Sequence, residues 1–364
     1  MKELTGNKGE WSEVYVLIKL LHDLKLFSAD EQLNKTTSYL EILFMLRKES
    51  AELQYLPEKN NINVIDVGTD NIIFTISNAD LLTLSKDLFE EIKGGRGNSF
   101  SLSKNINAQL KKLSINKVKQ GSTSKGDINI WVHDPSCGVR TQKKFSIKSF
   151  IGSDPTLFNA NKTTNIIYEI EDSSRMPMSA ALAAQINTIN TNYKYIDRIK
   201  NIIDKGFTIK YKKYEEEIFL LNLELIDSKL PEIIAFAVLE KYINRITKMS
   251  DVIDNLHNKN PVKYTVREGY NFYEYKIINF LVEASLGMTS AVIWNGIHDA
   301  TGGIIIVKDN SDVLCYHLVE FNKFKAYLKG ATRLDNPSGG RMGYGEVYIE
   351  EGKSYIKLNF QVKA

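Results

Sequence analysis

The chain has 364 residues, of which 43% are hydrophobic and 25% are charged, and this length can bury a large core in one elaborated domain or two. Its formal net charge of +3 excludes a protein that coats nucleic acid through bulk charge, so any such site must be a local patch. The 2 cysteines and 5 scattered histidines argue against a disulfide scaffold and against a zinc site.

The first predicted element is a helix that opens at Asn7 and repeats apolar residues at helical spacing as far as Leu24. At about 100° per residue, Glu10 and Glu13 both fall within the apolar arc. Glu10 lies three residues after Asn7, so a capping box accounts for it. A carboxylate that faces a core needs a partner. Glu13 is therefore either a ligand in a functional site or one half of an ion pair with a lysine.

Three further elements are predicted before the middle of the chain. Residues 40–51 favour a helix, and residues 63–67 and 72–77 favour a strand pair around the turn at 68–71. Residues 80–93 favour a helix that the glycines after it end. Residues 104–125 then hold six lysines and no acidic residue. This stretch either follows a phosphate backbone or is a solvated helix face.

The segment from Asp127 to Lys148 reads as two adjacent strands. Apolar residues alternate in 127–132, which leaves Asp127 on the opposite face, and a turn rich in Asp, Pro, Ser and Gly follows. The second strand, 145–149, places Ser146 and Lys148 on one face. An aspartate beside a lysine in this layout is typical of metal-dependent phosphodiesterases, in which the carboxylate binds a divalent cation and the lysine stabilises the attacking water. A solvated hairpin would produce the same pattern.

Ser146 occupies the position, two before the lysine, where such sites normally have a second acidic ligand. The pattern is therefore a degenerate form of the PD-(D/E)xK signature. We interpret Glu13 as the carboxylate that replaces the missing ligand.

Helices predicted at 218–226 and 233–246 suggest a second lobe. Residues 210–214 interleave tyrosine and lysine, but three glutamates follow, so a salt-bridged helix surface is favoured over a nucleic-acid contact. Residues 303–307 and 313–317 predict a hairpin, and 322–329 a short helix. A loop at 336–341 carries Arg341. Arginines there and at position 333 are candidates for reading guanine, although exposed arginines also occur without a specific role.

Four stretches resemble the HpaII-type restriction endonucleases, and they occur in the same order from the first helix to the last strand. They are Gly9-Glu10-Trp11-Ser12-Glu13, residues 145–152, residues 155–160 with Thr164-Asn165, and residues 358–362. The block around Lys148 is the most specific of them. Lys363 departs from the family pattern, which favours arginine at that position.

The resemblance implies an α/β fold. Residues 1–175 would form a PD-(D/E)xK-like nuclease core with a mixed central sheet flanked by helices. Residues 176–364 would form a helical segment and an α+β lobe, packed on the core and contacting DNA. The implied activity is that of a type II restriction enzyme that cuts both strands of a short palindromic site, CCGG in the family prototype, with Mg²⁺. A homodimer on DNA and a cognate DNA methyltransferase would accompany it.

The same resemblance assigns roles to individual residues. Asp127 and Lys148 match the catalytic pair, and Glu13 matches an acidic helix position. Metal ligands would be Asp127, Glu13 and a backbone carbonyl near Ile147, while Ser146 would orient the water or a metal-bound oxygen. The candidates for DNA contact are Lys125, Lys143, Lys144, Thr164, Asn165, Arg333 and Arg341.

Other functional classes fit less well. A DNA methyltransferase would need a glycine-rich cofactor loop and an Asn/Asp-Pro-Pro-aromatic motif, and an HNH nuclease would need clustered histidines; the sequence has neither. A sequence-specific DNA-binding protein with a decayed nuclease site remains open because of Ser146. The sequence has no run of about 18 apolar residues and no signal-peptide core, so we expect a cytosolic protein without a membrane partner.

Overall fold

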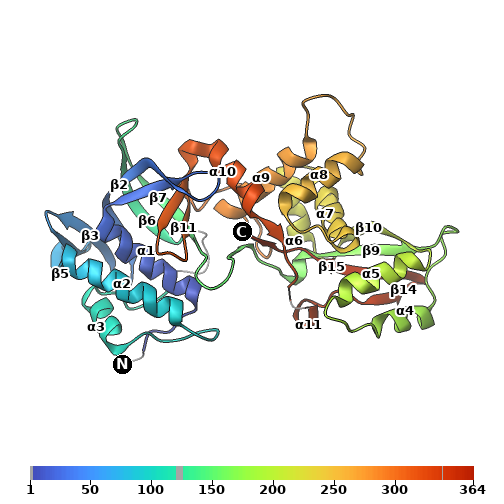
Figure 1. Ribbon diagram of the computed structural model, residues 1–364, viewed down its shortest axis with the longest axis horizontal. Coiled ribbons are helices and arrows are strands. Elements are labelled where there is room, and N and C mark those ends of the chain that lie inside the picture. The colour runs from blue at the N-terminus through green and yellow to red at the C-terminus, as the bar shows by residue number, and fades with distance from the viewer. Residues whose placement is uncertain (1–2, 120–125, 338) are drawn as a thin grey trace. The chain divides into compact units, whose positions relative to one another are not determined.

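The computed structural model describes residues 3–119, 126–337 and 339–364 (Figure 1). These residues form two compact units, each built from several segments of the chain. Unit 1 comprises the described residues up to Pro155 together with Ser285–Gly287 and His298–Tyr327, and unit 2 comprises Thr156–Ala284, Met288–Ile297 and Leu328–Ala364. The division expected from the sequence, at residues 175 and 176, differs from this one. The expected division placed the late hairpin of residues 303–317 in the second part of the chain, whereas this hairpin pairs with the sheet of unit 1.

Unit 1 is built around a nine-stranded sheet with the order β1-β12-β11-β7-β6-β2-β3-β4-β5, and β1 also pairs with β2. The strands are β1 (Lys25–Ala29), β2 (Lys35–Lys48), β3 (Glu52–Glu58), β4 (Asn61–Asp66), β5 (Asn71–Ser77), β6 (Ile128–Asp134), β7 (Val139–Ser149), β11 (Gly303–Val307) and β12 (Val313–His317). The pairs β1–β12 and β11–β7 are parallel, and the other pairs are antiparallel. The mixed central sheet expected from the sequence is therefore present.

The predicted hairpin at the centre of this sheet is confirmed. β6 and β7 pair in an antiparallel register that sets Ile128 opposite Phe145. At the turn, the Asp134 carbonyl accepts a hydrogen bond of 2.8 Å from the Gly138 N–H, and Gly138 has a φ of 71°, a left-handed value that glycine adopts without strain. Beyond the hairpin, β11 runs parallel to β7 on its other side.

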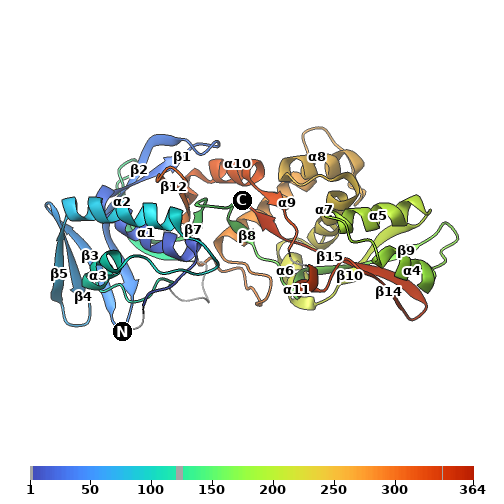
Figure 2. The same cartoon turned by 60° about the horizontal axis from the view of Figure 1, so that its bottom comes forward.

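The amino-terminal helix α1 (Lys8–Asp23) begins with the predicted capping box, in which Asn7 and Glu10 exchange hydrogen bonds. It lies beside α2 (Asn78–Gly94), and both helices cross one face of the sheet (Figure 2). Trp11 and Tyr15 on α1 are fully or almost fully buried in the core that also contains Phe145 of β7. Packing of this apolar stripe against the sheet fixes the helix in place.

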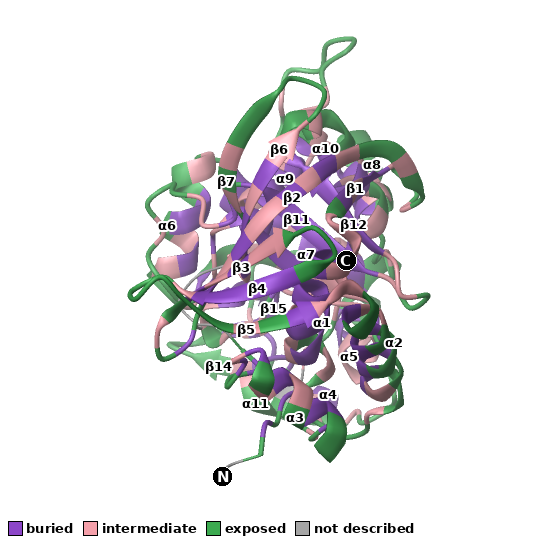
Figure 3. Ribbon diagram, turned by 90° about the vertical axis from the view of Figure 1, so that its left-hand side faces the viewer, coloured by how far each residue is buried: buried purple, intermediate pink, exposed green. Residues whose placement is uncertain are grey.

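Other predictions for unit 1 are confirmed with one exception. The strand pair β4–β5 and the helix α2 occur as predicted, and β4 is mostly buried while the edge strand β5 is largely exposed (Figure 3). The helix α3 (Lys104–Lys112) lies in the lysine-rich stretch. The helix predicted at 40–51 is wrong, because most of those residues belong to the long strand β2, which pairs with β1, β6 and β3. Ladder pairing on both sides overrides the helix propensity of Leu, Glu and Met there.

Unit 2 contains an antiparallel sheet of order β10-β9-β15-β14 and a smaller one of order β13-β16-β8. Their strands are β8 (Thr156–Phe158), β9 (Asn165–Glu171), β10 (Thr208–Tyr214), β13 (Arg333–Leu334), β14 (Val347–Glu350), β15 (Lys353–Asn359) and β16 (Val362–Lys363). The helices are α4 (Ala180–Asn187), α5 (Lys194–Asp204), α6 (Glu217–Ile226), α7 (Leu230–Asn244), α8 (Met249–Lys259) and the short α11 (Gly339–Met342). Helices α9 (Phe272–Leu286) and α10 (Phe321–Ala331) contribute residues to both units.

The predicted helices at 218–226 and 233–246 are confirmed by α6 and α7, and that at 322–329 by α10. Residues 210–214 form the strand β10, so the predicted helix surface is wrong there. Lys210 and Lys212 do form ion pairs, but with Glu171 and Glu169 of the neighbouring strand β9 and not with the glutamates that follow them. No helix among the described residues is long and apolar enough to cross a membrane.

Candidate active site

Asp127 is the residue immediately before β6, and the strand β7 holds it in place. Its backbone N–H donates to the Phe145 carbonyl at 2.9 Å. Its carboxylate Oδ2 accepts a hydrogen bond of 2.6 Å from the Ile147 N–H. Both bonds join Asp127 to the stretch of β7 that carries the predicted lysine. A backbone N–H of β7 thus helps to orient the carboxylate.

Ser146 is buried, and its Oγ donates to the same Asp127 oxygen over 3.2 Å. The sequence placed Ser146 on one face with Lys148 and assigned it to the water or a metal-bound oxygen, whereas in the structure its hydroxyl bonds to the Asp127 carboxylate. A hydroxyl can donate one hydrogen bond and accept others, whereas a carboxylate in its place would bring a second negative charge next to Asp127. The site has one acidic group on this strand pair.

Lys148 is half-buried on β7. Burial lowers the pKa of its ammonium group below the ordinary value, while the negative charges of Asp127 and Glu13 act in the opposite direction. Both carboxylates are therefore within electrostatic reach of this lysine, although Glu13 lies far from Asp127 and Lys148 in the sequence.

Glu13 reaches this position because α1 is fixed to β7. The adjacent Ser12 is completely buried, and its Oγ bonds to the Ser149 Oγ at 2.8 Å and to the Lys8 carbonyl at 2.7 Å. Glu13 itself is half-buried. Its charge acts on Lys148, so both readings of Glu13, as a ligand in a functional site and as the partner of a lysine, stay predictions.

The donor set resembles a magnesium site more than a zinc site. Among the described residues, no three His, Cys, Asp or Glu side chains gather as a metal centre. Two carboxylates, Asp127 and Glu13, are available, and hard cations such as Mg²⁺ bind through one or two carboxylates plus water and substrate phosphate. In a strand, the N–H and C=O of one residue point to the same edge. Since the Ile147 N–H faces Asp127, its carbonyl faces that edge as well.

One residue that the sequence analysis did not single out positions this site. Gly126 precedes Asp127, and a Cβ at this position would lie 3.1 Å from the Asp299 carbonyl and 3.2 Å from the Lys144 Cβ. The backbone is therefore closely surrounded just before Asp127. The only sign of this close packing in the sequence was a glycine directly before Asp127.

The predicted DNA contacts are distributed over both units. Lys143 and Lys144 lie on β7 in unit 1, the first half-buried and the second exposed. Lys125 lies outside the described residues. In unit 2, Arg341 is exposed on the short helix α11, and Arg333 is half-buried on β13.

Thr164 and Asn165 are buried, which does not support direct contact with DNA. The Thr164 hydroxyl bonds to the Asn161 carbonyl, and the Asn165 amide donates to Glu215 at 2.7 Å and to the Met342 carbonyl at 2.8 Å. Buried polar groups need such partners. Asn165 thus joins the start of β9 to the end of α11, and Thr164 is bonded to the turn at Asn161.

Comparison with known proteins identifies the family to which this chain belongs. Residues 7–364 match the model of the HpaII restriction endonuclease family. The chain is 38% identical over 363 residues, covering 99% of this chain and 98% of the relative, to the type II restriction enzyme HpaII of Haemophilus parainfluenzae. It is also 23% identical over 304 residues to the uncharacterized protein 050L of Invertebrate iridescent virus 6, covering 76% of this chain and 26% of that one. No solved structure matches. The chain belongs to the HpaII restriction endonuclease family and is a type II, site-specific endonuclease that acts on DNA.

Proposed function

We propose that this endonuclease hydrolyses both strands of double-stranded DNA at a short palindromic site in a Mg²⁺-dependent reaction, and that its core is of the PD-(D/E)xK type. The observation that carries the proposal is the pair of hydrogen bonds from Ser146 and the Ile147 N–H to the Asp127 carboxylate, one residue from Lys148. The likeness to HpaII makes CCGG the first target to test.

Asp127, Glu13 and the Ile147 carbonyl would hold the metal ion. When bound, Mg²⁺ would polarise the phosphodiester and lower the pKa of a coordinated water. Lys148 orients the attacking water and stabilises charge that develops on the phosphate oxygens. Ser146 holds the Asp127 carboxylate in the orientation that the metal ion requires.

A palindromic site presents the same sequence on both strands, and a two-fold dimer would place one active site on each of them. We therefore propose that two copies act together on DNA. A cognate methyltransferase that modifies the same site would protect the host genome from the activity.

The test is incubation of the protein with unmethylated plasmid DNA and Mg²⁺, followed by sequencing of the fragment ends. EDTA and the Asp127→Ala variant should each abolish the fragments, whereas Asp309→Ala, in the exposed turn between β11 and β12, should leave them unchanged. Fragments that persist in Asp127→Ala would contradict the assignment. Intact DNA that is nevertheless shifted on a gel would favour the alternative, a sequence-specific binding protein with a decayed nuclease site.

A further inference from the structure

Unit 2 contains a pocket of about 420 Å³ that has no part in the cluster around Asp127. Its walls come from α5, from the segment between α11 and β14, and from β15. The residues that line it are Lys194, Tyr195, Arg198, Gly340, Gly343, Tyr344, Glu346, Val347, Tyr348 and Lys357. Three of these carry a positive charge, three are tyrosines and one is acidic. Such a mixture is characteristic of surfaces that hold single nucleotides.

Two of the tyrosine rings in this pocket have an ammonium group beside them. The Tyr195 and Tyr344 rings lie with their centroids 4.8 Å apart and their planes at 33°. The Lys194 Nζ is 5.4 Å from the Tyr195 ring centroid, and the Lys357 Nζ is 5.6 Å from that of Tyr348. Lys357 also pairs with Glu215. An aromatic face stacks on any nucleobase, and an adjacent ammonium group attracts its phosphate.

The pocket is preformed. Arg198 is buried and donates to the carbonyls of Gly345 and Asn187, both at 2.6 Å. Gly345 has a φ of 88°, and a Cβ there would lie 2.2 Å from the Tyr195 Cδ1 atom. The segment that carries Tyr344 is therefore fastened to α5 by hydrogen bonds and by a contact that only glycine allows. A rigid pocket binds with a smaller loss of conformational entropy than a mobile one.

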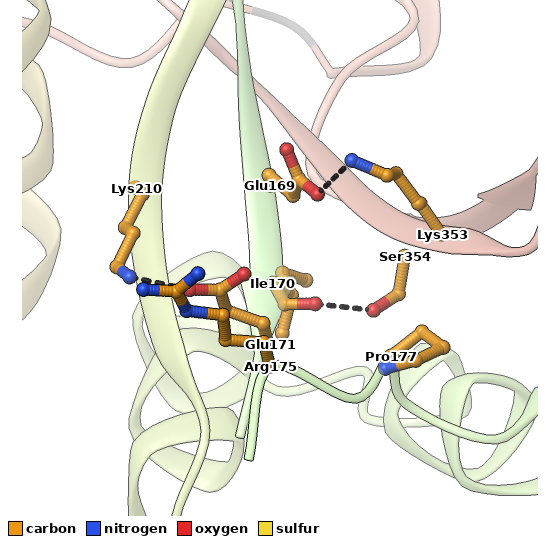
Figure 4. Close-up of a pocket in the computed structure, with 8 residues that line it drawn as sticks. All are labelled: Glu169, Ile170, Glu171, Arg175, Pro177, Lys210, Lys353 and Ser354. Atoms are coloured by element: carbon orange, nitrogen blue, oxygen red, sulfur yellow. Dashed lines mark hydrogen bonds and ion pairs between the residues drawn. The ribbon is translucent and has the colours of Figure 1, made fainter. Parts of the chain in front are cut away.

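A second pocket in the same unit serves as a contrast. It measures about 380 Å³ and lies along β9, β10 and β15 (Figure 4). Its carboxylates are matched by its lysines, because Glu169 pairs with Lys353 at 2.8 Å and Glu171 pairs with Lys210. It also lacks an aromatic residue in its lining. The tyrosine-lined pocket has the chemistry for a nucleotide, and the ion-paired one does not.

We propose that the tyrosine-lined pocket receives one unstacked nucleotide of the DNA substrate, with its base against Tyr195 and its phosphate near Lys194. This inference rests on the endonuclease acting on duplex DNA, and it adds that the duplex is distorted when bound. Arg341 lies between Gly340 and Gly343 in the same segment. A nucleotide in the pocket would therefore bring neighbouring bases to the residue that is our candidate for reading guanine.

The test uses duplexes that contain the site found by end sequencing, with each base in turn placed opposite an abasic position. An unpaired base costs less to unstack, so the preferred one should enter the pocket more easily. With Ca²⁺ in place of Mg²⁺, the full-length protein should bind one of these duplexes about tenfold more tightly than the matched duplex. Tyr195→Leu and Lys194→Gln should both lose this gain.

Two matched variants serve as controls. Tyr195→Phe keeps the aromatic ring and should keep the gain, and Lys200→Gln changes an exposed lysine of α5 that does not line the pocket. If Tyr195→Leu fails to fold, Lys194→Gln still decides the question. Equal affinity for every duplex, or a gain that survives Lys194→Gln, would overturn the proposal. Failure of the proposed function would be seen separately, as matched DNA that the unaltered protein leaves uncut in Mg²⁺.

Discussion

The two units assemble their polar side chains in different ways. In unit 1, Asp127 and Ser146 lie on neighbouring strands of one hairpin, and backbone hydrogen bonds set the carboxylate in place. In unit 2, the tyrosine-lined pocket joins α5 to a segment near the end of the chain, and a buried arginine holds the two together. The first arrangement suits chemistry on a phosphate, and the second suits recognition of DNA. The comparison suggests that cutting and binding can be impaired separately.

The variant Lys148→Ala should impair cutting without impairing binding, and it should have the largest effect of the variants proposed. Loss of the ammonium group removes the stabilisation of developing charge, so we expect the rate of cleavage to fall by about 1,000-fold. Binding should change little, because the proposed DNA contacts include several other cationic side chains. Cleavage under single-turnover conditions and a gel-shift titration measure the two effects. An equal loss in both assays would show that Lys148 serves binding, and would contradict the separation of cutting from binding.

The variant Arg341→Ala should instead weaken the binding of DNA. A bidentate contact to guanine is worth about 1–3 kcal/mol, so affinity for the cognate duplex should fall by roughly 5- to 150-fold. Arg175→Ala is the matched control, since this arginine is also exposed in unit 2 but lines the ion-paired pocket. Fluorescence anisotropy with cognate and scrambled duplexes measures the difference. If both variants bind as the unaltered protein does, Arg341 has no part in recognition.

Glu13→Gln should act through the metal ion. The amide keeps the shape of the side chain but removes its charge, so the Mg²⁺ concentration for half-maximal cleavage should rise by about tenfold. Saturating Mg²⁺ should restore much of the rate. Glu90→Gln, on the exposed side of α2, is the control. An unchanged Mg²⁺ dependence would mean that Glu13 only pairs with Lys148.

The smallest effect concerns the stability of unit 2. Lys241 is buried and donates to the Asp335 carbonyl, and burial lowers its pKa to about 7 against an opposing effect of the Asp335 charge. Below pH 7 both the folded and unfolded chains hold this proton. Between about pH 7 and the ordinary pKa of 10.5 only the unfolded chain does, so the free energy of unfolding rises with pH by at most about 1.4 kcal/mol per unit.

Lys241→Met should flatten this rise. Denaturant unfolding at several pH values between 6 and 9 measures it, and Lys205→Met, at an exposed position after α5, is the comparison. The variant also leaves the Asp335 carbonyl without its donor, which lowers stability equally at every pH. The slope with pH, and not the absolute stability, is therefore the diagnostic quantity. A slope equal to that of the unaltered protein would contradict the assignment.

The sequence predicted those features that depend on short stretches of chain. Alternation of apolar residues located the hairpin of Asp127 and Lys148, and the spacing of Asn7 and Glu10 located the start of α1. Glu13 was found because a charge on an apolar helix face needs a partner. The resemblance to a family added the order of the motifs, which no local pattern contains.

Features set by distant contacts could not be predicted in this way. Residues 40–51 have helix-forming side chains, yet most of them form β2 because strands are available on both sides. Thr164 and Asn165 are polar, yet they are buried by partners near the end of the chain. Tyr195 and Tyr344 meet only in the folded unit. In each case the deciding partner is far away in the sequence.

The pairing of β6 with β7 also makes the candidate site depend on the register of the two strands. Asp127 is bonded to Phe145 and Ile147 through the same ladder that aligns the two strands. A slip of one residue would turn every side chain of one strand to the opposite face, so Lys148 would point away from the aspartate. Under the proposed function, a copy with a slipped hairpin would lack the neighbouring aspartate and lysine and would not cut DNA. Cleavage would thus require that the two central strands pair in the correct register.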